Sequence, residues 1–273
     1  MGIPEIELID GNSIPSIGLG LWKVKDKQQF RVMFEAAYQA GYRHFDDAEA
    51  YANEQLLGLG WKNLGLKRES LFITTKSLAL HFNYKSTIDS FEESLKKLQT
   101  DHVDLLLVHF PGPTWLRRDK WRAIEDIKKA GKARSIGVSN YYVKHLNQLE
   151  SYANEMPVVN QIEMHVFRQQ LEIRQYCQKN NIQIEAYSPI AHAQIMDNPV
   201  IKQLADKYQK TYSQIMLRWC IDQQAIPLPK SVTPSRIQEN IDIFDFKLDD
   251  KDLERLKALD INHKSLWRSS LSG

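Results

Sequence analysis

Residues 84–109 read YKSTIDSFEESLKKLQTDHVDLLLVH, and this stretch contains both patterns on which the fold depends. Its first part places apolar residues at successive spacings of four, three, four and three: Tyr84, Ile88, Phe91, Leu95 and Leu98. This spacing predicts an amphipathic helix with one buried face. Its second part, residues 103–108, is apolar except for Asp104, which is typical of a parallel strand covered on both faces. A helix joined in this way to a buried strand is the repeating unit of an α/β fold.

The alternation of strand and helix continues along the rest of the chain. Seven further short apolar runs have strand character: 17–21, 42–46, 71–75, 133–138, 158–162, 182–187 and 225–228. Each is followed by a stretch of helical period, so the sequence contains eight strand–helix units. Eight such units in about 250 residues predict a (β/α)8 TIM barrel, with a doubly wound open sheet as the alternative. No G-x-G-x-x-G sequence follows any of these runs, which favours the barrel.

Local signals add detail to this prediction. The sequence Asp10-Gly11-Asn12 between short apolar runs predicts an N-terminal β-hairpin over residues 6–14. Asp26 is expected to cap the first helix, with Gln29 reaching back to it, and Gly41 is expected to end that helix. The whole chain, residues 1–273, is expected to form a single barrel domain.

Composition excludes several classes of protein. The chain is 42% apolar and 26% charged, with 36 basic and 34 acidic residues, so disorder is not expected. No block of five like charges occurs, which argues against a nucleic-acid partner. No window reaches the ~18 apolar residues of a membrane helix, and the first residues lack the pattern of a signal peptide. Cys177 and Cys220 are expected to be free thiols, and we expect a cytoplasmic monomer.

Polar residues follow most of the predicted strands. The active site of such a barrel lies at the carboxyl ends of its strands, so these residues are candidates for function. They are Asp46, Lys76, His109, Ser139, Asn140, Gln161, Glu163, Tyr187 and Ser188.

Four residues suggest a proton relay. A tyrosine with an ordinary pKa of about 10 donates a proton poorly near neutral pH unless a cation stabilises its phenolate. Lys76 is the candidate cation for Tyr51, and Asp46 would hold the lysine charged. His109 would orient a carbonyl group by a hydrogen bond. Together these catalytic candidates predict a site that reduces carbonyl groups.

A metal site is the alternative for the same region. Histidine and carboxylate side chains at strand ends also build metal-dependent hydrolases, and His44, Asp46, Asp47 and His109 would be the ligands. Adjacent residues of a strand point to opposite faces, so Asp46 and Asp47 are not expected to reach one ion. We therefore predict no metal, and we expect His44 to be packed inside the protein.

The segment after the last strand predicts an anion site. Thr233 and Pro234 are expected to begin a helix, which would gather Lys230, Ser231 and Arg236 around its N-terminus. Helix N-termini and arginine side chains bind phosphate groups, and barrels often place a phosphate site beside their last two strands.

These motifs resemble the aldo-keto reductase family, in particular its short microbial members that reduce diketo sugar acids and methylglyoxal. The segments that carry the resemblance are 18–22 (GLGLW), 42–54 (YRHFDDAEAYANE), 74–76 (TTK), 104–109 (DLLLVH), 137–140 (GVSN), 160–163 (NQIE), 186–189 (AYSP) and 229–240. The resemblance implies that Tyr51 is the general acid, with Asp46, Lys76 and His109 as its partners. It also implies an NADPH cofactor, with Tyr187 stacked on the nicotinamide ring.

The resemblance assigns further binding residues. Those expected to contact the cofactor are Gly20, Leu21, Asp46, Ser139, Asn140, Gln161, Tyr187, Ser188, Ile190, Lys230, Ser231, Val232, Arg236, Glu239 and Asn240. Those expected to contact the substrate are Trp22, Tyr51, His109 and Phe110. Asp47 departs from the family, which mostly has Thr or Ser at this position.

The expected function is therefore NADPH-dependent reduction of aldehydes and ketones, with hydride from the nicotinamide and a proton from Tyr51. The partner would be a small carbonyl substrate. The alternative is an NADPH-binding, redox-sensing protein that acts through a protein partner and turns over substrate only incidentally.

Overall fold

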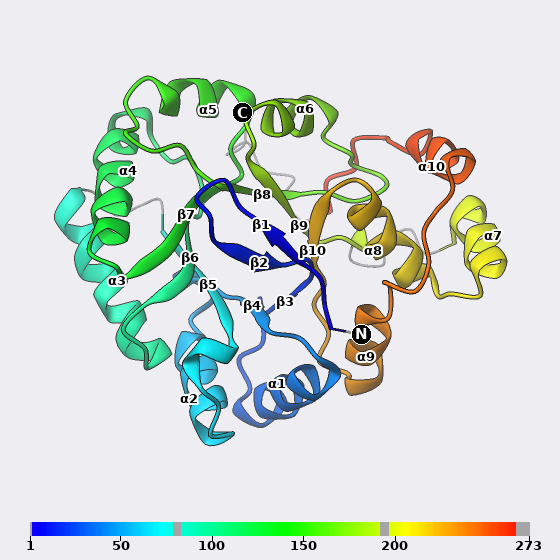
Figure 1. Cartoon of the computed structure of the whole chain (residues 1–273), viewed down its shortest axis with the longest axis horizontal. Coiled ribbons are helices and arrows are strands. Elements are labelled where there is room, and N and C mark those ends of the chain that lie inside the picture. Colours follow the sequence, from blue (N-terminus) through cyan, green and yellow to red (C-terminus); the bar gives the residue numbers. More distant parts are fainter. Residues whose placement is uncertain (1, 79–82, 192–196, 266–273) are drawn as a thin grey trace.

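Eight parallel strands form one sheet that nearly closes into a barrel (Figure 1). The structure is a computed structural model that describes residues 2–78, 83–191 and 197–265. In sheet order the strands are β3 (Gly18–Gly20), β4 (His44–Asp46), β5 (Phe72–Ser77), β6 (Val103–Val108), β7 (Ala133–Ser139), β8 (Val159–Glu163), β9 (Gln183–Tyr187) and β10 (Ala225–Leu228). The backbone N–H of Gly20 donates to the carbonyl of Pro229 at 2.9 Å, which links the first barrel strand to the segment after the last. The predicted barrel is confirmed.

Helices surround the barrel (Figure 1). They are α1 (Lys27–Ala40), α2 (Glu54–Asn63), α3 (Tyr84–Leu98), α4 (Thr114–Lys129), α5 (Val143–Glu150), α6 (Leu171–Lys179), α7 (Pro199–Tyr208), α8 (Tyr212–Asp222), α9 (Pro234–Ile241) and α10 (Asp250–Lys257). Two single 3₁₀ turns, η1 (Glu49–Tyr51) and η2 (Arg68–Ser70), precede α2 and β5. The units differ from the simple repeat in two respects: β9 is followed by two helices, and α10 is added after α9. Among the described residues, no helix combines the length and apolar character needed to cross a membrane.

Local signals in the sequence set the element ends. The carboxylate of Asp26 accepts a hydrogen bond from the backbone N–H of Gln29 at 2.7 Å and so caps α1. Gly41 ends the helix with φ 108°, a left-handed conformation that glycine adopts without steric cost. The range predicted from residues 84–98 is the range of α3, and its N-cap is Asn83 in a capping box with Ser86.

The core has two layers, as alternating side chains on the strands require. Leu105 and Leu107 of β6 belong to a cluster inside the barrel, while Leu106 and Val108 belong to the larger cluster beneath the helices. The strands β1 (Glu5–Glu7) and β2 (Ser13–Pro15) form the predicted hairpin, which adds Leu8 and Ile14 to the interior cluster. Figure 1 shows this hairpin lying across the centre of the barrel.

The hairpin closes the end of the barrel at which the strands begin. The side chain of Asn12 donates to the carbonyl of Arg134 at 3.2 Å and to the hydroxyl of Ser135 at 3.1 Å, near the start of β7. The hairpin thus covers the end at which the strands begin. The polar residues predicted at the strand ends lie at the opposite end, which we call the open end.

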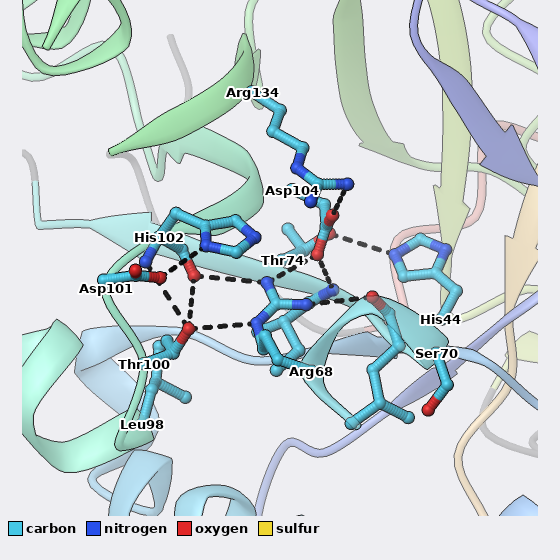
Figure 2. Close-up of polar contacts among 12 residues, drawn as sticks. His44, Arg68, Ser70, Thr74, Leu98, Thr100, Asp101, His102, Asp104 and Arg134 are labelled. Carbon is cyan, nitrogen blue, oxygen red and sulfur yellow. Dashed lines mark hydrogen bonds and ion pairs between the residues drawn. The ribbon is translucent and has the colours of Figure 1, made fainter. Parts of the chain in front are cut away.

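A buried ion pair joins the turn η2 to β6 at the closed end (Figure 2). The guanidinium of Arg68 donates to the Asp104 carboxylate at 2.6 Å and to the Thr100 hydroxyl at 3.0 Å. The same carboxylate accepts from the backbone N–H of Ile73 at 2.8 Å, and Arg134 lies 3.3 Å from its second oxygen. These contacts explain the single charged residue in the apolar run 103–108, because Asp104 links η2, β5 and β7 to β6.

Candidate active site

Lys76 lies at the centre of the polar cluster at the open end of the barrel. Its ammonium donates to the Asp46 carboxylate at 2.7 Å, to the backbone carbonyl of Asp47 at 2.8 Å and to the Tyr51 hydroxyl at 3.3 Å. Asp46 ends β4 and Lys76 is on β5, so strand pairing sets their separation. Tyr51 ends the 3₁₀ turn η1, which follows β4 and brings its side chain back over the strand end.

His109 completes the predicted group of four. Its ring lies edge-on to the ring of Tyr51, with the centroids 5.7 Å apart and an interplanar angle of 80°. It is stacked on Phe110, with the centroids 4.5 Å apart. The side-chain amide of Asn140 donates to the carbonyl of His109 at 3.1 Å and holds the backbone after β6. The structure therefore brings the four catalytic candidates together.

Burial and charge set the protonation of this group. Burial acts to lower the pKa of Lys76, but Asp46 and Tyr51 outweigh it, so the pKa lies above its ordinary value. Burial raises the pKa of Tyr51 to about 12, although the Lys76 ammonium acts in the opposite direction. Burial and the Lys76 ammonium lower the pKa of His109 to about 3. At neutral pH the site therefore holds a charged lysine, a protonated tyrosine and a neutral histidine.

A second set of hydrogen bonds runs along the ends of β7, β8 and β9. The hydroxyl of Ser139 donates to the carbonyl of Gln161 at 3.0 Å, and the amide of Asn140 donates to Ser139 at 3.1 Å. The hydroxyl of Tyr187 donates to the Asn140 side-chain oxygen at 2.8 Å. The amide of Gln161 donates to Asp46 at 2.8 Å, which joins this set to the lysine cluster. Four residues predicted to bind a cofactor therefore lie together beside the four catalytic candidates.

Glu185 also belongs to the site, and the prediction from sequence missed it. Its carboxyl accepts from the same Gln161 nitrogen at 2.9 Å, and its other oxygen lies 3.6 Å from His44. Glu185 precedes Tyr187 by two residues on β9, so the period of a strand already placed both on one face. His44 is buried as predicted, but it is not purely packing, since it lies 3.0 Å from the Thr74 hydroxyl.

The alternative metal ligands do not converge. Asp46 faces Lys76 and Gln161, whereas the Asp47 carboxylate accepts from the backbone N–H of Ala48 at 2.8 Å. Residues 2–78, 83–191 and 197–265 contain no group of three His, Cys, Asp or Glu side chains arranged to hold a metal ion. Asp47 is fully buried, and burial with the nearby Glu54 carboxyl raises its pKa well above the ordinary value.

The predicted anion segment lies beside the first barrel strand. Thr233 is the N-cap residue of α9 and Pro234 is its first residue, as predicted. Lys230 and Arg236 are exposed there, and neither forms an ion pair with a described residue. The hydroxyl of Ser231 accepts from the backbone N–H of Thr233 at 3.1 Å, and the Thr233 side chain makes no capping hydrogen bond to α9.

The remaining predicted contacts are spread around the open end. Gly20 approaches the Leu228 carbonyl so closely that a Cβ atom there would lie 3.3 Å from it. Leu21 is buried, whereas Trp22, Ser188, Ile190 and Val232 are partly buried. Asn240 is buried on α9, and the carboxylate of Glu239 accepts from the Thr211 hydroxyl at 2.7 Å.

Comparison with known proteins identifies the family of this chain. Residues 16–261 match the model of the aldo/keto reductase family. The chain is 42% identical over 254 residues to a glyoxal reductase of Bacillus subtilis strain 168, an alignment that covers 93% of this chain and 92% of that protein. It is 41% identical over 258 residues to a methylglyoxal reductase of Escherichia coli K12, with 93% of each chain covered. A crystal structure of an aldo-keto reductase of Bombyx mori in complex with NADP superposes with a TM-score of 0.91 and 34% identity, covering 98% of this chain and 96% of that one. The chain therefore belongs to the aldo/keto reductase family of oxidoreductases.

Proposed function

We propose that this protein reduces aldehydes and ketones with NADPH, and that Tyr51 donates the proton to the carbonyl oxygen. The observation that carries the proposal is the position of the Lys76 ammonium, which contacts both the Asp46 carboxylate and the Tyr51 hydroxyl. A phenol that loses its proton beside this ammonium is stabilised as a phenolate. Because burial otherwise holds the proton on Tyr51, the tyrosine remains an acid until a carbonyl oxygen develops charge beside it.

His109 and Tyr51 would bind the carbonyl oxygen together. Their rings lie edge to face, and His109 is neutral at physiological pH, so it offers one N–H donor without adding charge. Two donors aimed at one oxygen stabilise charge that develops on it during reduction. Trp22 and Phe110 would form the apolar wall of the substrate pocket.

The residues at the strand ends fit a nicotinamide cofactor, which would supply the hydride when it is bound. Ser139, Asn140 and Gln161 would hold its carboxamide group, and the ring of Tyr187 would lie against the nicotinamide. Lys230, Ser231 and Arg236 would hold the 2′-phosphate of NADPH. The fit of these residues to a phosphate group rests on Lys230 and Arg236, two exposed cations near the start of α9. Neither has an ion-pair partner among the described residues. Other contacts would come from Gly20, Leu21, Asp46, Ser188, Ile190, Val232, Glu239 and Asn240.

The substrate class follows from the relatives. One is named a glyoxal reductase and another a methylglyoxal reductase. We propose small aldehydes and dicarbonyl compounds as substrates. The test is the decrease of NADPH absorbance with methylglyoxal, glyoxal, a nitrobenzaldehyde and a diketo sugar acid. Turnover of about one per second or more would support the proposal, since enzymes commonly turn over at this rate or faster. Tight NADPH binding without turnover of any of them would instead support the redox-sensing alternative.

We also propose that residues 1–273 act as one domain, as a monomer in the cytoplasm. Cys177 and Cys220 are both buried free thiols, which is typical of a reducing compartment. Light scattering after gel filtration measures the mass directly, and a mass of twice 31.8 kDa would contradict the monomer.

A further inference from the structure

Glu185 lies inside the barrel beneath the residues that face its open end. It is on β9 two residues before Tyr187, so both side chains are on the same face of the strand. It is fully buried, and the reduction proposed above does not use it. One of its oxygens accepts a hydrogen bond from Gln161, and the other has no hydrogen-bond partner among the described residues.

Gln161 joins Glu185 to the catalytic group. Its side-chain nitrogen donates to Asp46 at 2.8 Å and to Glu185 at 2.9 Å. A carboxamide nitrogen carries two hydrogens, so these two carboxyl groups use both of them. The amide is thereby fixed with its nitrogen between the carboxyl groups, and its oxygen faces away from them.

The charges around Glu185 do not balance if it is ionised. The titratable groups that face it from the neighbouring strands are Asp46 and His44 of β4 and Lys76 of β5. Lys76 already pairs with Asp46, and burial with the Lys76 ammonium lowers the pKa of His44 to about 3, so His44 is neutral.

The strands that pair with β9 add no cation. In the described chain, β8 offers the uncharged Gln161 opposite Glu185, and β10 offers Ile226. A second carboxylate at this place would be a buried charge without a partner, which is costly. Burial and the Asp46 carboxylate accordingly raise the pKa of Glu185 to about 8.

We propose that Glu185 is a positioning residue that carries a proton beneath the Asp46–Lys76 pair and releases it when the bound nicotinamide is in its cationic, oxidised form. This inference rests on the proposed function, because it requires that a nicotinamide binds above Gln161. The oxidised ring adds one positive charge to the open end of the barrel. An ionised Glu185 balances that charge, whereas a protonated Glu185 suits the neutral reduced ring. Binding of NADP⁺, relative to NADPH, is then linked to release of one proton.

The proton on Glu185 is tested first without any cofactor. Protein labelled with ¹³C at the glutamate carboxyl carbons is titrated by NMR from about pH 6 to about pH 10, above the ordinary glutamate pKa of about 4.3. We expect one carboxyl signal to titrate near pH 8 and to be missing from Glu185→Gln. The inference is overturned if every glutamate is already ionised at the start of this range.

The linkage is tested by binding. The dissociation constants of NADP⁺ and NADPH are measured by fluorescence over the same pH range, and their ratio cancels the titration of the shared 2′-phosphate. In the unaltered protein the ratio of the NADP⁺ constant to the NADPH constant is expected to fall as pH rises, by at most about tenfold per pH unit for one proton. In Glu185→Gln the ratio is expected to stay flat.

Glu163→Gln is the matched control. Glu163 is also buried at the open end, but the nearby His165 ring, 3.5 Å away, and the hydrogen bonds accepted from Ser265 outweigh burial and hold its pKa below the ordinary value. It is already ionised over this range, so its removal should leave the slope of the ratio intact. Equal slopes in Glu185→Gln and the unaltered protein would refute the linkage while leaving the reductase function standing.

Failure of the proposed function gives a different result. If neither nucleotide binds, the function fails, and the NMR titration alone decides whether Glu185 carries a proton. If Glu185→Gln does not fold, calorimetry of NADP⁺ and NADPH binding to the unaltered protein in buffers of different ionisation enthalpy counts the protons released. More release with NADP⁺ near neutral pH supports the linkage, and equal release overturns it.

Discussion

The Lys76 ammonium lies 2.7 Å from the Asp46 carboxylate, although the two residues are 30 positions apart in the chain. Their side chains are only 0% and 5% exposed. The pair is held by neighbouring strands β4 and β5 rather than by loops, so its geometry is as rigid as the barrel. This rigidity allows Lys76 to present its charge to Tyr51 before any ligand binds.

Replacing Tyr51 by Phe removes the proposed proton donor and little else. We expect kcat to fall by about 10²- to 10⁴-fold, the usual contribution of general acid catalysis, with little change in the dissociation constant of NADPH. Tyr84→Phe is the control, because the Tyr84 hydroxyl donates to Asp126 between α3 and α4, in the outer layer of helices. Equal turnover in Tyr51→Phe and the unaltered protein would exclude Tyr51 as the acid.

Arg236→Ala should weaken binding of NADPH but not of NADH. A hydrogen bond to a charged group contributes about 1.5–3 kcal/mol, so we expect the dissociation constant of NADPH to rise by roughly 10- to 100-fold. NADH lacks the 2′-phosphate and serves as the control ligand on the same variant. A similar loss for both nucleotides would show that Arg236 does not read the phosphate.

Asp47→Asn should change how stability depends on pH. The folded protein keeps the Asp47 proton where the unfolded chain has lost it, because the pKa of Asp47 is raised by burial and by Glu54. Native stability therefore falls as pH rises above the unfolded pKa of about 3.9, by at most about 1.4 kcal/mol per pH unit. The variant lacks this loss, so its stability relative to the unaltered protein should increase from about pH 4 upward.

The measurement is urea unfolding of both proteins at several pH values. Asp89→Asn, on the exposed face of α3, tests whether the loss of any aspartate has the same effect. A constant difference between Asp47→Asn and the unaltered protein would show that Asp47 is ionised in the folded state.

The buried Arg68–Asp104 ion pair at the closed end should contribute to the stability of the fold and not to catalysis. Asp104→Asn leaves Arg68 as a buried cation without its partner, and such a change typically costs about 3–5 kcal/mol of unfolding free energy. We expect kcat at a temperature well below unfolding to be unchanged, because the pair lies at the opposite end of the strands. The double variant Arg68→Met/Asp104→Asn should recover part of the unfolding free energy that Asp104→Asn loses. If the double variant instead loses the sum of what Arg68→Met and Asp104→Asn each lose, the two residues do not interact directly.

Much of the fold was predictable from local patterns. The apolar run 103–108 and the helical spacing over 84–98 give the bounds of β6 and α3, because periodicity reports which side chains are buried. Where a strand was predicted too long, as at 17–21 against Gly18–Gly20, apolar residues continue past its ends, and the backbone N–H of Leu21 still donates to the Asp46 carbonyl at 3.0 Å. The extra helix after β9 was missed, although Asn198-Pro199 at the start of α7 and the Thr211–Gln214 capping box at the start of α8 are separate start signals.

The sequence by itself determined the barrel, the hairpin and which polar residues stand at the ends of the strands, because these depend on short-range spacing. Only the tertiary structure decided how those residues are charged and linked. Gln161 and Asp46 are 115 positions apart, yet one nitrogen of Gln161 joins Asp46 to Glu185. The pKa of a buried group depends on desolvation and on charges a few ångströms away, and neither can be predicted from the residues next to it in the chain. For this reason Tyr51, Lys76 and His109 could be named from the sequence. The protonation of Glu185 and Asp47 could be inferred only from their surroundings in the folded barrel.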